Sequence, residues 1–283
     1  MRHFLPVRST LASVPQNFRQ KPWRSLFLLT LGLTILGSSG LHDRAIAATP
    51  ETAPAPLKQA LTQIDAAANR KNLPGVLQFY SPNFAHSDGL NRRSLEQALT
   101  QLWRQYPNLA YRTELKSWQP DGRGIRAETV TYISGTQTVN GQSLKLDSTL
   151  QSQQRFEGQT IVQQDILAET SKVTSGENPP DVKVSLPQQV RVGQDFSFDA
   201  IVQDPLGSDL LLGSALEESV KPSGYLSPTT ADLELLTSGG IFKVGRASKT
   251  PENRWISAVL VRHGGTTIVT QRLRVVAGSP IAK

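Results

Sequence analysis

The sequence contains no cysteine and only four histidines among its 283 residues. Disulfides therefore contribute nothing to the fold, which must be stabilised by buried apolar surface alone, and no cysteine is present to be lipidated. Gly-x-Ser-x-Gly and His-Glu-x-x-His motifs are also absent, which leaves serine hydrolase and zinc metalloprotease chemistry without its residues. His86 and Asp88 lie close together in the sequence, but two ligands do not make a zinc site. We therefore expect no metal and no cofactor.

Long hydrophobic runs are scarce. The clear run, Leu26 to Gly37, spans about a dozen residues, whereas a membrane-spanning helix needs roughly 20. Residues 1–24 carry five Lys or Arg and no acid, and Ala45-Ile46-Ala47 forms a small-residue cleavage pattern. This order predicts a signal peptide over residues 1–47, cleaved before Ala48; a retained signal anchor is the alternative. We expect an exported protein without a membrane span after processing, in the periplasm or another extracytoplasmic space such as the thylakoid lumen.

Most of the excess positive charge lies in the leader. The full chain has 30 Lys and Arg against 23 Asp and Glu, a net charge of +7. Without residues 1–47 these numbers become 24 and 22, a net charge of only +2. No run of Lys or Arg remains that could neutralise successive phosphates, so we expect no nucleic-acid partner.

Changes in composition divide the chain into segments. Residues 48–56 have proline at nearly every other position, which predicts an extended spacer. Residues 171–180 lack large apolar residues apart from one valine and end in two prolines, which predicts a domain boundary. The expected organisation is a signal peptide (1–47), a spacer (48–56), a first domain (57–170), a linker (171–180), a second domain (181–277) and a tail (278–283).

The first domain begins with helical patterns. Apolar residues between Leu57 and Ala68 repeat at spacings of four, three and four. Ser94 followed by Gln97 is a capping-box signature. The expected elements are a helix from Leu57 to about Lys71, a shorter helix over Leu73 to Tyr80, a polar loop over Asn83 to Arg93, and a third helix that starts at Ser94 and ends at Pro107.

Alternating patterns replace helical ones after Pro107. The pairs Asp121-Gly122, Asn140-Gly141 and Glu157-Gly158 favour tight hairpin turns and predict a four-stranded antiparallel meander. In the third of these strands, one face combines leucines with Ser148, Ser152 and Gln154. Such a face is not a dry core throughout. We expect the sheet to pack helices along part of its length and to line a cavity along the rest.

The second domain contains short strand patterns separated by Gly and Pro turns, which is typical of a β-sandwich. The strongest hairpin pattern joins residues 254–263 to residues 266–276 through Gly264-Gly265. Pairing across that turn predicts Ile256 opposite Leu273, Leu260 opposite Val269, and Trp255 opposite Arg274.

The order of helix, short helix, loop, helix and four-stranded meander resembles the nuclear transport factor 2-like superfamily over residues 56–170. Leu57-x-x-x-Leu61-x-x-Ile64 and the Gly75 to Tyr80 segment carry the resemblance. The chain is most similar to exported two-domain members of cyanobacteria. The resemblance implies an α+β fold in which three helices cover a curved antiparallel sheet as a cone around a pocket, followed by an all-β, immunoglobulin-like sandwich. Members of this superfamily include isomerases, dehydratases, polyketide cyclases and binding modules.

The resemblance also implies where a catalytic base would lie. Ketosteroid isomerases place a carboxylate base in the loop after the second helix, and Asp88 is near that position with His86 close by. This sequence departs from the pattern, because strand positions that could hold an oxyanion carry Ser148, Ser152 and Gln154 and the first helix has no tyrosine. A simple loop turn at Asp88-Gly89 is the alternative.

Three functional hypotheses remain open from the sequence. The one we favour is a non-catalytic exported protein that binds a small apolar ligand or a peptide in the first domain, with the sandwich docking to a protein partner in the cell envelope. A second is an isomerase or dehydratase that uses Asp88 and His86, and a third is an envelope assembly or structural factor. A homodimer is expected by analogy only. The residues expected to line the pocket are Tyr80, His86, Asp88, Trp103, Ser148 and Ser152.

Overall fold

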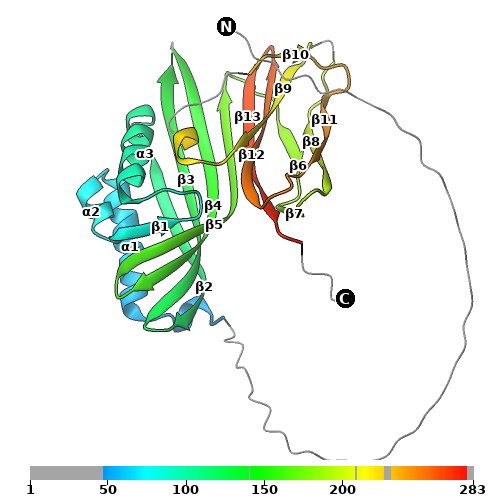
Figure 1. Ribbon diagram of the computed structural model, residues 1–283. Coiled ribbons are helices and arrows are strands. Elements are labelled where there is room, and N and C mark those ends of the chain that lie inside the picture. The colour runs from blue at the N-terminus through cyan, green and yellow to red at the C-terminus, as the bar shows by residue number, and fades with distance from the viewer. Residues whose placement is uncertain (1–46, 140, 208, 226–230, 279–283) are drawn as a thin grey trace, which may run out of the picture. The chain divides into compact units, whose positions relative to one another are not determined.

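The computed structural model describes residues 47–139, 141–207, 209–225 and 231–278 (Figure 1). The described residues all belong to one compact unit. The expected signal peptide, except for Ala47, and the expected tail from residue 279 onward lie outside the described residues. Within the described ranges, no helix has both the length and the apolar character needed to cross a membrane.

Short helical elements make up the first part of the fold. They are η1 (Pro50–Thr52), α1 (Ala55–Asn69), α2 (Leu73–Leu77) and α3 (Arg92–Gln105). Helix α1 matches the expected first helix to within two residues at each end. Its apolar face buries Leu57, Ala60 and Leu61 against the sheet, as the periodicity predicts.

The predicted spacer over residues 48–56 does not run as a free extended segment. Ala48 pairs with Trp118, through N–H to carbonyl distances of 2.8 and 3.1 Å. The Trp118 indole N–H also donates to the Thr52 hydroxyl at 3.1 Å. The prediction was wrong because β2 offers this segment an unpaired edge, and Ala53 is buried in the core beneath it.

The predicted loop over residues 83–93 contains a strand. Helix α2 ends at Leu77, and β1 (Tyr80–His86) follows and pairs in parallel with β5. Phe79 and Phe84 are both buried. The predicted helix to Tyr80 was therefore too long, because an extended chain from Tyr80 onward allows both rings to reach the core.

Helix α3 begins two residues before the predicted start at Ser94. Asn91 is its N-cap, and the Asn91 side chain accepts from the Ser94 N–H at 2.9 Å. The Ser94 hydroxyl in turn accepts from the Asn91 N–H at 2.8 Å. A capping box is thus present, but Ser94 occupies its third helical position instead of its cap.

The predicted meander is confirmed. It consists of β2 (Ala110–Asp121), β3 (Gly124–Val139), β4 (Gln142–Glu157) and β5 (Thr160–Ser175), each antiparallel to the next. Figure 1 shows α1, α2 and α3 gathered against these strands. In β4, Leu146, Ser152 and Phe156 are buried while Lys145 and Asp147 are exposed, in agreement with the predicted alternation.

The second half of the fold is all β apart from one short helical turn, η2 (Pro222–Tyr225). Its strands are β6 (Val182–Ser185), β7 (Gln189–Arg191), β8 (Asp195–Val202), β9 (Leu212–Ser219), β10 (Glu234–Leu235), β11 (Gly240–Arg246), β12 (Glu252–Arg262) and β13 (Gly265–Val276). A three-stranded sheet in the order β11-β8-β6 packs against β12 and β13. Phe198, Leu260 and Leu273 are at the centre of this core.

One ten-stranded sheet crosses the predicted linker. Strand β5 continues to Ser175 and pairs with β4 on one side and with β13 on the other, through residues 170–175. The predicted linker over 171–180 is therefore wrong for its first half. The small polar side chains there suit a strand whose main-chain groups are hydrogen-bonded on both sides. The structure is thus a β-rich α+β fold. Its main sheet runs in the order β10-β9-β12-β13-β5-β4-β3-β2, and its remaining two strands pair off this path, β1 with β5 and β7 with β13.

The β12–β13 hairpin forms as expected, but its register differs by two residues. Trp255 lies opposite Arg272, not Arg274, and Ile256 lies opposite Gln271. The strands close at Arg262 and Gly265. Gly265 is the first residue of β13. The position requires glycine, because a Cβ there would come within 2.1 Å of the Ser175 carbonyl oxygen. The shift leaves the core face unchanged, since side chains two residues apart share a face.

We expect the two halves to unfold together because they share a sheet. Leu57→Ala in the first core and Leu260→Ala in the second should each lower the free energy of unfolding by about 2–5 kcal/mol. Urea denaturation followed by circular dichroism and by tryptophan fluorescence should give coincident transitions in both variants. Leu210→Ala, at a position that is 71% exposed, is the control. A variant that shifts only one of two resolved transitions would contradict the single unit.

Candidate functional site

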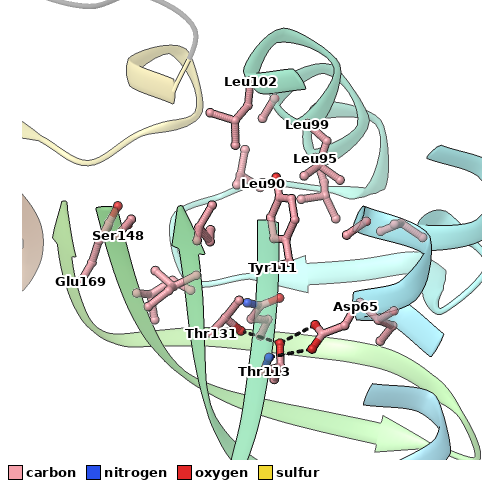
Figure 2. A pocket seen from close by; sticks show the side chains of 18 of the residues that line it. Asp65, Leu90, Leu95, Leu99, Leu102, Tyr111, Thr113, Thr131, Ser148 and Glu169 are labelled. Carbon is pink, nitrogen blue, oxygen red and sulfur yellow. Dashed lines mark hydrogen bonds between the residues drawn. The ribbon is translucent and has the colours of Figure 1, made fainter. Parts of the chain in front are cut away.

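A cavity of about 400 Å³ lies between the helices and the inner face of strands β2 to β5 (Figure 2). Most of its lining is apolar. Figure 2 shows the side chains of Leu95, Leu99 and Leu102 from α3, with Leu90 before it, on one side of the cavity and the strands on the other. The strands add Ile133, Leu146, Leu150 and Ile166, and α1 adds Leu61, Ile64 and Ala68.

Polar groups line the cavity at separate positions. Asp65 of α1 accepts hydrogen bonds from the Thr113 N–H at 2.6 Å and the Thr113 hydroxyl at 2.7 Å, and the Thr113 hydroxyl lies 3.0 Å from that of Thr131 (Figure 2). Ser148 and Glu169 line the opposite side in this view. Asp65 falls on the helical face of Leu61 and Ala68, three or four residues away. The sequence therefore carried a signal for it that our prediction did not use.

The structure brings three of the six expected pocket residues to the cavity. Tyr80, His86 and Ser148 line it, whereas Asp88, Trp103 and Ser152 are not among its lining residues. Trp103 lies behind the wall, where its indole N–H donates to the hydroxyl of Tyr111, a lining residue, at 2.8 Å. Ser152 is also buried, and its hydroxyl accepts from the Gln164 amide at 3.3 Å.

Burial changes the titration of the lining phenols. Desolvation raises the pKa of Tyr80 to about 12. It also raises the pKa of Tyr111 to about 12, although the hydrogen bond from Trp103 opposes the change. Both phenols are therefore neutral near pH 7.

His86 has one nitrogen fixed by its own loop. Its Nδ1 accepts from the Asp88 N–H at 3.1 Å. Burial lowers the pKa of His86, and the charge of Arg272 lowers it further against the opposing effect of Asp88. The ring is therefore neutral near pH 7, with its proton on Nε2.

Asp88 points away from the cavity and into a buried ionic cluster. The Arg272 guanidinium donates to both its oxygens, at 2.8 and 2.9 Å, and both side chains are fully buried. Tyr225 donates to the same carboxylate at 2.6 Å and Asn253 at 3.2 Å. We call Asp88, Glu169, Tyr225, Trp255 and Arg272 the Arg272 cluster.

Glu169 joins the Arg272 cluster to the cavity. Its Oε2 accepts from Arg272 Nε at 3.1 Å, Arg272 Nη2 at 2.8 Å and the Trp255 indole N–H at 2.9 Å. The Tyr225 and Trp255 rings meet edge to face, with centroids 4.9 Å apart. Glu169 and Tyr225 also line the cavity. The second half of the chain therefore supplies part of the wall of a cavity that the first half encloses.

The Arg272 cluster holds Asp88 and Arg272 in their charged forms. Burial alone would raise the pKa of Asp88, but the hydrogen bonds and charge of Arg272, with Tyr225, outweigh it and the pKa is lowered. Burial would lower the pKa of Arg272, and its acidic partners raise it instead. Sequence reasoning missed Arg272, Glu169 and Tyr225, because their partners are up to 184 residues away in the chain.

Metal ligands do not gather anywhere in the part of the chain that the structure describes. No group of three or more His, Asp or Glu side chains there could hold an ion. His86 Nδ1 is 3.7 Å from Asp88 Oδ2 and is committed to a main-chain N–H.

Loss of Arg272 should destabilise the fold strongly. We expect Arg272→Met to lower the free energy of unfolding by about 3–5 kcal/mol, because it leaves the buried Asp88 carboxylate without its cation. Arg274→Met, two residues along β13 and only partly buried, is the matched control and should change stability by less than about 0.5 kcal/mol. Urea denaturation measures both; equal effects would contradict the role of the cluster.

Acid should weaken the same contact. The folded-state pKa of Asp88 is below its ordinary value, so its contribution to stability is complete above about pH 4 and is lost as the pH falls further. The difference in unfolding free energy between the wild type and Asp88→Asn should therefore shrink on acidification below about pH 4. Urea denaturation across this range tests it, and a difference that widens there would contradict the assignment.

Comparisons with known proteins find a similarity over part of this chain. A family model described as "Domain of unknown function (DUF8623)" matches residues 177–276. No curated protein sequence matches the chain. Among solved structures, the chain is similar to that of Bd1075 from Bdellovibrio bacteriovorus, with 12% identity and a TM-score of 0.28. The alignment covers 39% of this chain and 38% of that one, so the chain spans well under half of that protein's length. The matched family segment contains Tyr225, Trp255 and Arg272.

Proposed function

We propose that the protein is an exported binding protein that holds a small amphipathic ligand in the cavity between its helices and strands β2 to β5. The observation that carries the proposal is the cavity itself, which has about 400 Å³ and a mostly apolar lining with a few separate polar groups. Ligand sites of soluble proteins have this size and composition. Export rests on the leader pattern in residues 1–47.

The arrangement also supports the finer fold assignment that we propose. Helices α1 and α2, strand β1, helix α3 and the β2–β5 meander follow one another in the order of the nuclear transport factor 2-like superfamily. The sheet order of β6 to β13 is compatible with an immunoglobulin-like sandwich, although β9, β12 and β13 also extend the sheet of the first half. Both assignments are proposals from order and topology.

Catalysis by Asp88 is the weaker candidate. A general base must present a free lone pair to the substrate and must have a pKa near the working pH. The Asp88 carboxylate is fully buried, accepts hydrogen bonds from Arg272, Tyr225 and Asn253, and has a lowered pKa. These contacts favour a structural role. A purely structural protein is disfavoured by a cavity of about 400 Å³, because interiors without a ligand role are normally close-packed.

Occupation of the cavity can be tested with a neutral fluorescent probe. N-phenyl-1-naphthylamine should bind the wild type saturably, with one probe per chain and increased fluorescence. Ala98→Trp fills the cavity from α3, since Ala98 lines it, and should weaken binding by about tenfold or more, which corresponds to about 1.4 kcal/mol.

Gln97→Trp is the matched control, because Gln97 is the neighbouring residue on the exposed side of α3. It adds the same ring outside the cavity and should leave probe binding unchanged. Thermal denaturation of both variants checks that they are folded. The proposal fails if the two variants bind the probe equally, or if the wild type does not bind it saturably.

A further inference from the structure

The charges around the cavity have one sign. Its lining side chains include two acids, Asp65 and Glu169, and no Lys or Arg. Arginine does lie behind the wall, at position 272, but its guanidinium is fully buried. A ligand inside the cavity therefore meets carboxylates directly and meets no cationic side chain.

The positive charge of Arg272 does not balance the acids around it. One guanidinium serves both Asp88 and Glu169, and it takes up both oxygens of Asp88. Only Oε2 of Glu169 faces the cluster. Within the described residues, Glu169 Oε1 has no hydrogen-bond partner. One negative charge is thus left at the side of the cavity formed by β5.

The second acid has only neutral partners. Each oxygen of Asp65 accepts one hydrogen bond, from the main-chain N–H or the hydroxyl of Thr113. Neither partner carries a charge. Asp65 comes from α1 and Glu169 from β5, so the two carboxylates face the cavity from different walls.

A buried amide oxygen supports the same interpretation independently of charge. Gln154 lines the cavity and is 8% exposed, and its Oε1 is buried without a hydrogen-bond partner. A buried polar atom without a partner costs about 1–3 kcal/mol. Gln154 therefore adds an unpaired acceptor to the wall of the cavity.

We propose that the ligand carries an amine on an apolar body, with Glu169 Oε1 as the main contact of its ammonium group. This inference rests on the proposed binding function and names the chemical class of its ligand. A carboxylate-bearing ligand such as a fatty acid would bring a third negative charge into a poorly solvated space and would be repelled. An ammonium group would pair with Glu169 and donate to the acceptors that the protein leaves open.

Three ligands with the same chain and different head groups test this. Decylamine, decanol and decanoate, each below its micelle-forming concentration, compete with N-phenyl-1-naphthylamine for the wild type at neutral pH. Decylamine should displace the probe at a concentration at least about tenfold below that of decanoate, with decanol between them. Decanoate that competes as well as decylamine, or better, would overturn the inference.

Variants locate the contact. Glu169→Gln should remove most of the preference for decylamine over decanoate, and Asp65→Asn should reduce it. Asp147→Asn removes a carboxylate that is half exposed on the outer face of β4 and should leave the preference unchanged. Glu169→Gln is lost to misfolding if it weakens the Arg272 cluster too far. In that case the order in which the three competitors displace the probe from the wild type, and its change in Asp65→Asn, still test the amine inference.

The outcomes separate the two proposals. Two results would overturn the amine inference and leave the binding function standing. In the first, the probe binds but decanoate competes better than decylamine. In the second, the preference for decylamine over decanoate is the same in all three variants as in the wild type. Failure of the probe and of all three competitors to bind overturns the binding function and the amine inference together.

Discussion

The structure depends on a buried guanidinium. Taking Arg272 and its two acids out of water costs several kcal/mol per ion, and only near-complete hydrogen bonding can offset that cost. The contacts meet this demand, since Asp88 is held through both oxygens and Glu169 through one. This cost favours one arrangement of the chain, because any arrangement that separates Asp88 from Arg272 leaves a buried charge without a partner.

This contact fixes the cavity wall. Asp88 follows β1, Glu169 lies on β5 and Arg272 on β13, so one side chain joins segments from the beginning, middle and end of the fold. The Tyr225 and Trp255 rings meet edge to face, and each donates a hydrogen bond to one of the two acids. Glu169 is thereby oriented with one oxygen toward Arg272 and with the other left open. Arg272, which does not line the cavity, thereby fixes the orientation of a carboxylate that does.

Local patterns predicted the local structure well. The spacing of Leu57 to Ala68 located α1, and the Asp-Gly and Glu-Gly pairs located hairpin turns of the meander. The mixed face of β4 predicted a cavity, and Tyr80, His86 and Ser148 line it. Predictions failed where a distant partner decides the outcome. The composition of residues 171–175 indicates a linker, but these residues form a strand because β13 pairs with them. The position of Asp88 suggests a catalytic base, but its carboxylate is bound by Arg272.

The pairing of β5 with β13 has a consequence for how such proteins can change over time. Six residue pairs join the two strands, and Gly176 and Gly265 allow their backbones to approach closely where a Cβ would collide. Exchange of either half for an unrelated module would leave a strand edge without hydrogen-bond partners and a buried charge without its counter-ion. Each half therefore depends on the other for a strand neighbour and for the partner of a buried charge.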